Sequence, residues 1–287
     1  MLIWRLVLGA VFIGGVAGLC WADYHATAPG IFLLPLALVV ATGATREMID
    51  MLRRGGWQPA AWPVYLGNAA IVAANWFSRS GSLGDFDGPA FAFAFSVIVV
   101  FAVEMARYRE PGRSSVNLGA AILVLAYVGW LMTFLVELRF VGGPQTGMAA
   151  LVSLVIVVKM CDTGAYTIGR LIGRHKMAPR LSGGKTIEGL AGGLLFACLG
   201  SWCSFRFVVP GLASAALPAL PGQTWLVFGL LVGFAGVLGD LAESLLKRDL
   251  GCKDSSTWMP GFGGVLDVID SLLLAAPVGY VVWRWVS

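Results

Sequence analysis

The sequence has 287 residues, of which 58% are hydrophobic and only 13% are charged. Soluble globular domains are roughly 45–50% apolar and about 25% charged, so this composition excludes an ordinary soluble domain. The net charge of +4 is modest, and we expect no nucleic-acid partner. We predict an all-α, polytopic integral membrane protein that contacts membrane lipid.

Apolar runs that are long enough to cross a bilayer recur along the whole chain. A spanning helix needs about 20 predominantly apolar residues. The second and fourth runs are short for a full span, which indicates tilted or shallow helices. We predict nine transmembrane segments, at about Leu2–Trp21, Ile31–Thr42, Ala61–Trp76, Ala90–Val103, Val116–Leu138, Met148–Cys161, Ile187–Val209, Thr224–Leu246 and Val265–Val286.

The charges between these segments alternate along the chain. The loops after the second, fourth, sixth and eighth segments are basic, whereas the intervening loops hold at most one arginine each. The positive-inside rule places the basic loops in the cytoplasm. We therefore predict a cytoplasmic N-terminus in a multi-pass protein of the cytoplasmic membrane. The basic residues are Arg46, Arg53, Arg54, Arg107, Arg109, Arg113, Arg170, Arg174, Lys176, Arg180, Lys185, Lys247, Arg248 and Lys253.

The loop predicted at 162–189 mixes cations and hydroxyls with glycines. This mixture suits a polyanionic phosphate ligand, which takes point charges and backbone N–H donors and needs room for close approach. The positive-inside rule explains the arginines, but it does not explain Asp162, Glu188 or the glycines. The residues predicted to bind the ligand are Asp162, Arg170, Lys176, Ser182, Lys185, Thr186 and Glu188.

Four carboxylates flank the next basic loop. Asp240 and Glu243 are three residues apart, as are Asp267 and Asp270, so each pair lies on one helical face. We expect the loop to bring the pairs together, where they repel one another unless cations bind. Mg²⁺ prefers one or two carboxylates with waters and substrate phosphates, so this pattern indicates metal-assisted phosphoryl or nucleotidyl transfer. Glu243 also fits an ion pair with Lys247, which makes it the weakest candidate metal ligand.

The polar chemistry is thus confined to the later part of the chain. We assign residues 1–110 to N-terminal transmembrane helices that pack and face lipid. Residues 111–287 form the predicted catalytic region, with cytoplasmic loops at 162–189 and 247–264.

The same stretches resemble the phosphatidate cytidylyltransferase family, also called CDP-diacylglycerol synthases. Its signature has the form S-x-x-K-R-x4-K-D-x5-P-G-H-G-G-x-x-D-R-x-D. The upstream loop is also similar, with DTGAY at 162–166 and S-x-x-K-T-x-E-G at 182–189. The resemblance is specific over about 159–277. The matching signature residues are Gly239, Asp240, Ser244, Lys247, Arg248, Lys253, Asp254, Pro260, Gly261, Gly263, Gly264, Asp267 and Asp270.

The resemblance implies transfer of a cytidylyl group from CTP to phosphatidate, which forms CDP-diacylglycerol and diphosphate for phospholipid synthesis. It implies Mg²⁺ held by Asp240 and Asp267, and a second cation such as K⁺. The residues to which we assign catalytic roles are Lys247, Arg248, Lys253, Asp254 and Asp270. Further substrate contacts are expected from Ser244, Gly261, Gly263 and Gly264.

Two positions depart from the signature, because Phe262 replaces its histidine and Val268 replaces its arginine. The histidine is not required to create the nucleophile, since a phosphate monoester with a second pKa near about 6 is already largely deprotonated at neutral pH. Two alternatives stay open: a degenerate family member that binds nucleotide or lipid without turnover, and an ion-coupled transporter. A transporter predicts charges near the bilayer midplane, whereas here they cluster at one surface.

Glycine pairs at a spacing of four residues occur in the later segments. Examples are Gly189 with Gly193 and Gly229 with Gly233. Such faces let helices approach closely, and the general enrichment of glycine in membrane helices is an equally good explanation. They permit a homodimer but do not require one.

Overall fold

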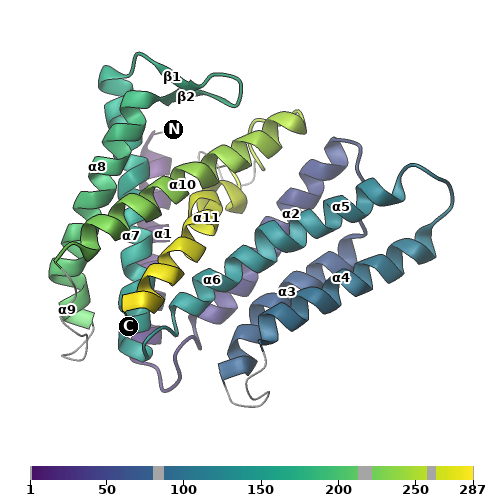
Figure 1. Ribbon diagram of the computed structural model, residues 1–287, viewed down its shortest axis with the longest axis horizontal. Helices are drawn as coiled ribbons and strands as arrows, with labels where there is room; N and C mark the ends of the chain where they lie inside the picture. The colour runs from purple at the N-terminus through teal and green to yellow at the C-terminus, as the bar shows by residue number, and fades with distance from the viewer. Residues whose placement is uncertain (1, 80–86, 213–221, 257–262, 287) are drawn as a thin grey trace. The chain divides into compact units, whose positions relative to one another are not determined.

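The computed structural model describes residues 2–79, 87–212, 222–256 and 263–286, and these are mostly helical (Figure 1). Two helical stretches are π-helical, at Leu125–Trp130 between α5 and α6, and at Ser204–Val208 between α8 and α9. The other elements are α1 (Leu2–Tyr24), α2 (Leu33–Arg54), α3 (Ala61–Arg79), α4 (Gly88–Arg107), α5 (Ser114–Val124), α6 (Leu131–Leu138), α7 (Pro144–Ile172), β1 (Lys176–Ala178), β2 (Ser182–Thr186), α8 (Ile187–Cys203), α9 (Val209–Leu212), α10 (Thr224–Asp249) and α11 (Val265–Val286).

Every predicted apolar segment overlaps a helical stretch, and six of the described stretches are long and apolar enough to cross a membrane. The fourth predicted segment was expected to be short, but α4 has 20 residues and is one of these six. The full count of nine spans and the cytoplasmic N-terminus stay predictions. The six stretches are Gly88–Arg107, Ser114–Leu138, Pro144–Ile172, Ile187–Leu212, Thr224–Asp249 and Val265–Val286.

α2 runs well past the apolar segment that the sequence predicts there. The predicted segment ends at Thr42, whereas the helix continues to Arg54. The second half of α2 is amphipathic: Met48 and Leu52 are buried four residues apart, and the side chain of Arg46 is exposed. A helix can therefore continue through this basic stretch, because its apolar face packs while its charges face outward.

The two predicted catalytic loops are helical at their N-terminal ends, which corrects their boundaries. Asp162 and Arg170 lie in α7, and Lys247 and Arg248 lie in α10. Polar side chains do not end a helix by themselves, and pairs three or four residues apart even support one. The structure has such a pair in α7, where Lys159 Nζ lies 3.2 Å from Asp162 Oδ2.

Between α7 and α8 the chain forms an antiparallel hairpin of β1 and β2, which the all-α prediction missed. Figure 1 shows the hairpin beyond the adjoining ends of α7 and α8. Its strands have only three and five residues, and β2 reads SGGKT. Strands this short, with glycines in place of alternating apolar residues, have little periodicity to detect.

The chain folds as two compact units that each combine two segments. Unit 1 comprises Met1–Val136 and Lys247–Val268, and unit 2 comprises Glu137–Leu246 and Ile269–Ser287. The predicted division at residue 110 separated helices expected to pack and face lipid from the region expected to be catalytic. It concerns function and stays a prediction. The compact units divide the chain at other residues.

In unit 1, α3 packs against α2, α4 and the π-helical stretch. A buried polar contact links two of these helices, since Asn68 Nδ2 donates to Thr45 Oγ1 at 2.7 Å. Gly129 in the π-helical stretch leaves room for Asn68, because a Cβ there would collide with the Asn68 amide oxygen. The polar pair thus links α2 to α3, and Gly129 gives it the room that it needs.

In unit 2, glycines let three helices pack closely. A Cβ on Gly193 of α8 would lie 3.1 Å from the carbonyl oxygen of Cys161 in α7. A Cβ on Gly229 of α10 would lie 2.8 Å from Cys198 Cα in α8. The predicted glycine faces are therefore packed against helices of the same chain. They no longer support a homodimer.

Candidate functional site

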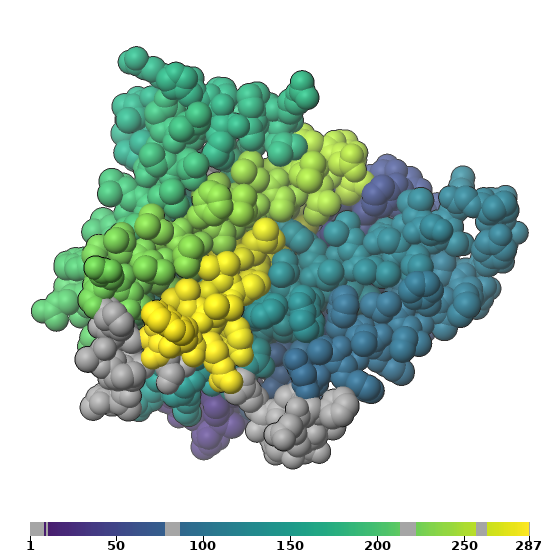
Figure 2. Space-filling view, viewed as in Figure 1, coloured from purple at the N-terminus to yellow at the C-terminus, as the bar shows by residue number. Residues whose placement is uncertain are grey.

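α10 and α11 approach each other closely at Gly239, where a Cβ would lie 2.5 Å from the carbonyl oxygen of Asp270 and 3.0 Å from Ser271 Cα. Figure 2 shows the two helices side by side on one face. Because only a glycine permits this approach, it brings the next residue of α10, Asp240, near Asp270. The sequence predicted that these two carboxylates would meet, and within unit 2 they do.

Unit 2 contains a group of charged residues that we call the acidic cluster: Asp162, Asp240, Glu243 and Asp270 with Lys159 and Lys185. Asp240 Oδ2 lies 2.7 Å from Lys185 Nζ, which reaches it from β2. Asp240 is also close enough to act electrostatically on both Asp162 and Asp270. Glu243 and Asp270 are buried, with 1% and 6% exposure, and their side chains hydrogen-bond to each other.

The acidic cluster holds four carboxyl groups and two lysines. Two carboxyl groups can hydrogen-bond only if they share a proton, and like charges this close disfavour full ionisation. A bound cation relieves the same repulsion, and carboxylate oxygens are the donors that Mg²⁺ prefers. Among the described residues, however, no three Asp, Glu, His or Cys side chains are arranged to hold a metal ion. The donor chemistry thus fits a hard cation, while Lys185 engages the carboxylate of Asp240.

In unit 1, Asp267 is held from several sides. Lys247 Nζ donates to Asp267 Oδ1 at 2.7 Å, and these side chains are only 12% and 13% exposed. The other oxygen, Oδ2, accepts from Gly264 N at 2.7 Å, from Ser255 Oγ at 2.6 Å and from Ser255 N at 3.1 Å. Charge-assisted hydrogen bonds of this kind fix the rotamer of a carboxylate. The carboxylate of Asp267, a predicted metal ligand, is therefore held in one orientation, and Lys247, a predicted catalytic residue, donates to it.

The sequence analysis missed Glu47 and Ser255, which join this network. Glu47 accepts hydrogen bonds from Val265 N, Leu266 N and Ser255 Oγ at 2.8 to 3.0 Å. The only signal was an acidic residue on the apolar face of α2. Nothing local shows that its partners lie about 200 residues later in the chain.

Two residues predicted to bind substrate also hold the hairpin and α8 in place. The Glu188 carboxylate accepts from the backbone N–H groups of Arg174 and His175 at 3.1 and 3.2 Å, and it lies 2.6 Å from the His175 ring nitrogen Nδ1. Thr186 is the N-cap of α8, since its Oγ1 accepts from Gly189 N at 3.1 Å. Both side chains thus help to close the base of the hairpin. This local structural role explains why both residues are present here.

The other predicted site residues vary in their contacts. Arg170 Nη1 donates to the Tyr166 hydroxyl at 2.7 Å, and Arg248 Nη1 donates to Cys252 O at 3.3 Å. Ser244 is buried in α10. Gly263 has a φ of +82°, which favours glycine. Exposed or half-buried positions are taken by Lys176, Ser182, Lys253 and Asp254. Gly261, with Pro260 and Phe262, lies outside the described residues.

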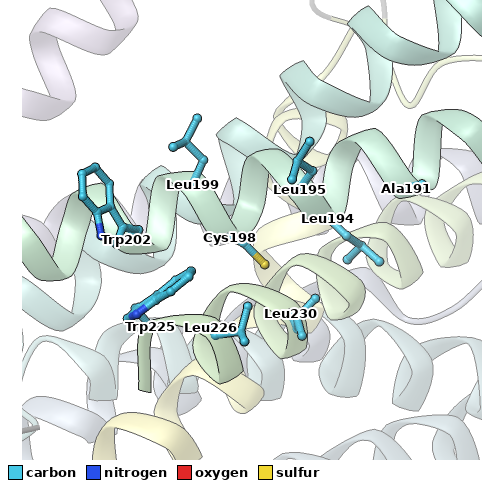
Figure 3. Close-up of a pocket in the computed structure, with 9 residues that line it drawn as sticks. All are labelled: Ala191, Leu194, Leu195, Cys198, Leu199, Trp202, Trp225, Leu226 and Leu230. Carbon is cyan, nitrogen blue, oxygen red and sulfur yellow. The ribbon is translucent and has the colours of Figure 1, made fainter. Parts of the chain in front are cut away.

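A groove of about 520 Å³ between α8 and α10 carries none of this chemistry. Figure 3 shows Trp202 and Trp225 at one end and leucines along both walls. The lining contains no acidic or basic side chain, and Cys198 is its single thiol. Such a surface suits a lipid tail and excludes the groove as the place where phosphates react.

The comparison with known proteins decides the family. The sequence model of the cytidylyltransferase family matches residues 3–286. The chain belongs to the cytidylyltransferase family. It is 28% identical over 286 residues to the phosphatidate cytidylyltransferase of Mycobacterium bovis, an alignment that covers 97% of this chain and 88% of the relative.

Staphylococcal relatives are more similar over shorter stretches. The phosphatidate cytidylyltransferase of Staphylococcus aureus is 35% identical over 187 residues, or 64% of this chain and 65% of the relative. That of Staphylococcus saprophyticus is 36% identical over 157 residues, or 55% of each chain. The family resemblance seen in the signature is thus confirmed, and it extends through the N-terminal helices of this cytidylyltransferase.

Proposed function

We propose that this protein is a phosphatidate cytidylyltransferase of the cytoplasmic membrane. The observation that carries the proposal is the ion pair between Lys247 and Asp267, two signature residues of the family that the fold holds 2.7 Å apart in a chain poor in charge. Charged side chains in membrane proteins are costly, and they usually mark function. The relatives that match most of the chain carry the same activity in their names.

The reaction transfers a cytidylyl group. A phosphate oxygen of phosphatidate attacks the α-phosphorus of CTP, and the bond between the α-phosphorus and the bridging oxygen to the β-phosphate breaks. Diphosphate leaves with that oxygen, and CDP-diacylglycerol remains in the membrane. The attacking phosphate needs no general base, because it is largely deprotonated at neutral pH. This is why a family member with Phe262 in place of histidine can retain the activity.

The protein's contribution is to neutralise and orient phosphates. In this proposal Lys247, Arg248 and Lys253 face the triphosphate and the leaving diphosphate, since transfer between two anions depends on positioned positive charge. Lys185 and Lys176 bind the nucleotide from the hairpin. The remaining proposed contacts are Asp162, Arg170, Ser182, Thr186, Glu188, Ser244, Asp254, Gly261, Gly263, Gly264 and Asp270.

Mg²⁺ is part of the proposal, with Asp240 and Asp267 as its ligands. Their oxygen donors suit a hard cation, and the excess of carboxylates over lysines in the acidic cluster favours one. When bound, Mg²⁺ supplies Lewis-acid stabilisation of phosphate charge. Lys185 and Lys247 pair with these carboxylates and keep them oriented. A second cation such as K⁺ completes the proposed set.

We also propose the topology that the charge pattern predicts: nine spans, a cytoplasmic N-terminus and a site that faces the cytoplasm. The six apolar helical stretches support a multi-pass protein. The basic ends of α2 and α4 and the basic hairpin follow the alternation that the positive-inside rule requires.

The test is diphosphate release from CTP by the purified protein in mixed micelles, with and without phosphatidate and Mg²⁺. We expect release that depends on both, and a loss of about 100-fold or more in Asp267→Asn, because a transfer between two anions relies on each charge that orients them. Asp50→Asn on the exposed side of α2 is the control, and its rate should equal that of the wild type.

Release without phosphatidate dependence would contradict the proposed substrate. No release from folded protein would contradict the enzyme, and CTP binding alone would then identify the degenerate family member that Phe262 and Val268 suggest.

A further inference from the structure

Glu47 lies in the region that the sequence assigned to packing, yet its carboxylate contacts the signature stretch. Oε1 accepts a hydrogen bond from Val265 N at 2.9 Å, and Oε2 accepts one from Leu266 N at 2.8 Å. These amides belong to the first turn of α11, where N–H groups have no partner inside the helix. Glu47 is 4% exposed. A buried carboxylate of α2 therefore caps another helix, and a negative charge is favourable at this end.

Ser255 connects this cap to Asp267. Its hydroxyl oxygen lies 3.0 Å from Glu47 Oε2 and 2.6 Å from Asp267 Oδ2. A serine hydroxyl has one proton, so it donates to one carboxylate at a time. Gly264 lies against both groups, because a Cβ there would collide with Ser255 Oγ and with the Glu47 carboxylate. The cap, the serine and Asp267 thus lie in one tightly packed row, in which the two carboxylates share the single proton of the serine hydroxyl.

A helix cap ordinarily affects stability alone. Here the capped turn also carries the functional carboxylate, since Asp267 follows directly after Leu266. The N–H of Gly264 at the start of this turn donates to Asp267 as well. If the first turn of α11 shifts, Asp267 therefore loses both its position and its hydrogen bonds.

We propose that Glu47 is a positioning residue for nucleotidyl transfer, which fixes the first turn of α11 and, through Ser255, the orientation of the Asp267 carboxylate. This inference rests on the proposed function, in which Asp267 holds the metal. It gives α2 a part in the chemistry that the family signature, confined to the later stretches, does not contain.

The test replaces Glu47 with glutamine, which keeps the size of the side chain. The side-chain NH₂ group of glutamine would face a backbone N–H, and two donors cannot form a hydrogen bond. We expect kcat to fall by about 10- to 100-fold, as when a partner that orients a metal ligand is removed. The KM for CTP should stay within about twofold, and the Mg²⁺ concentration for half-maximal rate should rise. Glu104→Gln is the matched control, since Glu104 is a buried glutamate of unit 1 that pairs with Arg107 and Asn117 instead.

A second measurement does not depend on turnover. Hydrogen exchange of the backbone amides at 264–266 should accelerate at least about tenfold in Glu47→Gln, and it should not change in Glu104→Gln. Amides elsewhere in α11 should keep the wild-type exchange rates. A purely structural role predicts faster exchange throughout unit 1 in both variants.

Ser255→Ala keeps the hydrogen bonds from the first turn of α11 to Glu47 and removes the hydroxyl between Glu47 and Asp267. It therefore tests the connection between the two carboxylates if Glu47→Gln fails to fold. We expect kcat to fall while the exchange at 265 and 266 stays slow. The effects of the two substitutions on kcat should be strongly non-additive in the double variant, because both break the same chain of contacts.

Equal kcat in Glu47→Gln and wild type would overturn the proposal. So would a loss matched by Glu104→Gln, because removal of any buried glutamate would then suffice. If the wild type itself releases no diphosphate, the proposed function fails. The exchange data still decide whether Glu47 fixes the first turn of α11. Unchanged exchange at 264–266 would overturn that claim as well.

Discussion

At the scale of single residues, Gly239 sets the distance between α10 and α11 where both helices carry acids. The adjacent Asp240 and the facing Asp270 can interact only because no side chain separates the two backbones. The close approach is therefore as much a part of the site as the carboxylates themselves, although glycine has no chemistry of its own.

Gly239→Ala should destabilise the protein, although alanine favours a helix more than glycine does. Its Cβ would lie 2.5 Å from a backbone oxygen that cannot move freely, and overpacking of this kind typically costs about 1–3 kcal/mol. A lower midpoint of thermal unfolding in detergent would show it, together with lower diphosphate release.

Gly211→Ala in α9 is the control, because a Cβ there meets no atom of the described residues within 4 Å. It should leave the midpoint unchanged or raise it. Equal midpoints for the two variants would mean that α10 and α11 can separate without cost.

The sequence could predict the acids of α10 and α11 but not the residue that holds them in place. Asp240 and Asp267 stand out because few residues of the chain are charged and because they recur at helical spacing. Glu47 has no such pattern, since its hydrogen-bond donors lie 208 to 219 residues away. Long-range contacts of this kind leave no mark in a local window of sequence.

At the scale of elements, one carboxylate makes several of the contacts at the base of the hairpin. Glu188 at the start of α8 binds the chain as it leaves α7, at Arg174 and His175. Lys185 at the end of β2 in turn reaches Asp240. The hairpin thus connects α7 and α8 to the acidic cluster.

Glu188→Gln should loosen the hairpin, because an amide presents only one acceptor oxygen to the two backbone donors and the histidine. We expect trypsin to cleave after Arg174, Lys176 or Arg180 several-fold faster than in the wild type, as judged by the appearance of the two large fragments. Glu110→Gln, in the exposed turn before α5, should leave this cleavage unchanged. Equal rates in both variants would show that the hairpin does not depend on Glu188.

Helix ends were the least predictable part of the fold. Hydropathy ends a segment at the first charges, whereas α2, α7 and α10 continue through them for another 3 to 12 residues. A helix needs only a continuous backbone ladder and one packed face, and neither requirement depends on a fully apolar sequence. Glycines mark the real ends better: Gly173 follows α7, and Gly251, with a φ of +69°, follows α10.

At the scale of the whole molecule, the nine spans that we propose would place the two ends of the chain on opposite sides of the membrane. Alkaline phosphatase fused to the C-terminus should therefore be active outside the cytoplasm. The same reporter fused after Gly251 should be inactive, because the loop after α10 is predicted to be cytoplasmic. Equal activity of the two fusions would require an even number of spans after the signature loop and would contradict the proposed topology.

The reach of Glu47 across the sequence also has a consequence for biosynthesis. Chains grow at about 5–20 residues per second, so Val265 and Leu266 are made roughly 10 to 40 seconds after Glu47. Until then the nascent α2 lacks the three donors at Ser255, Val265 and Leu266, so the position of Glu47 against the start of α11 is set late in synthesis. A messenger truncated before codon 255 would encode a chain that never receives these donors, and such a product should be a preferred target of membrane quality control.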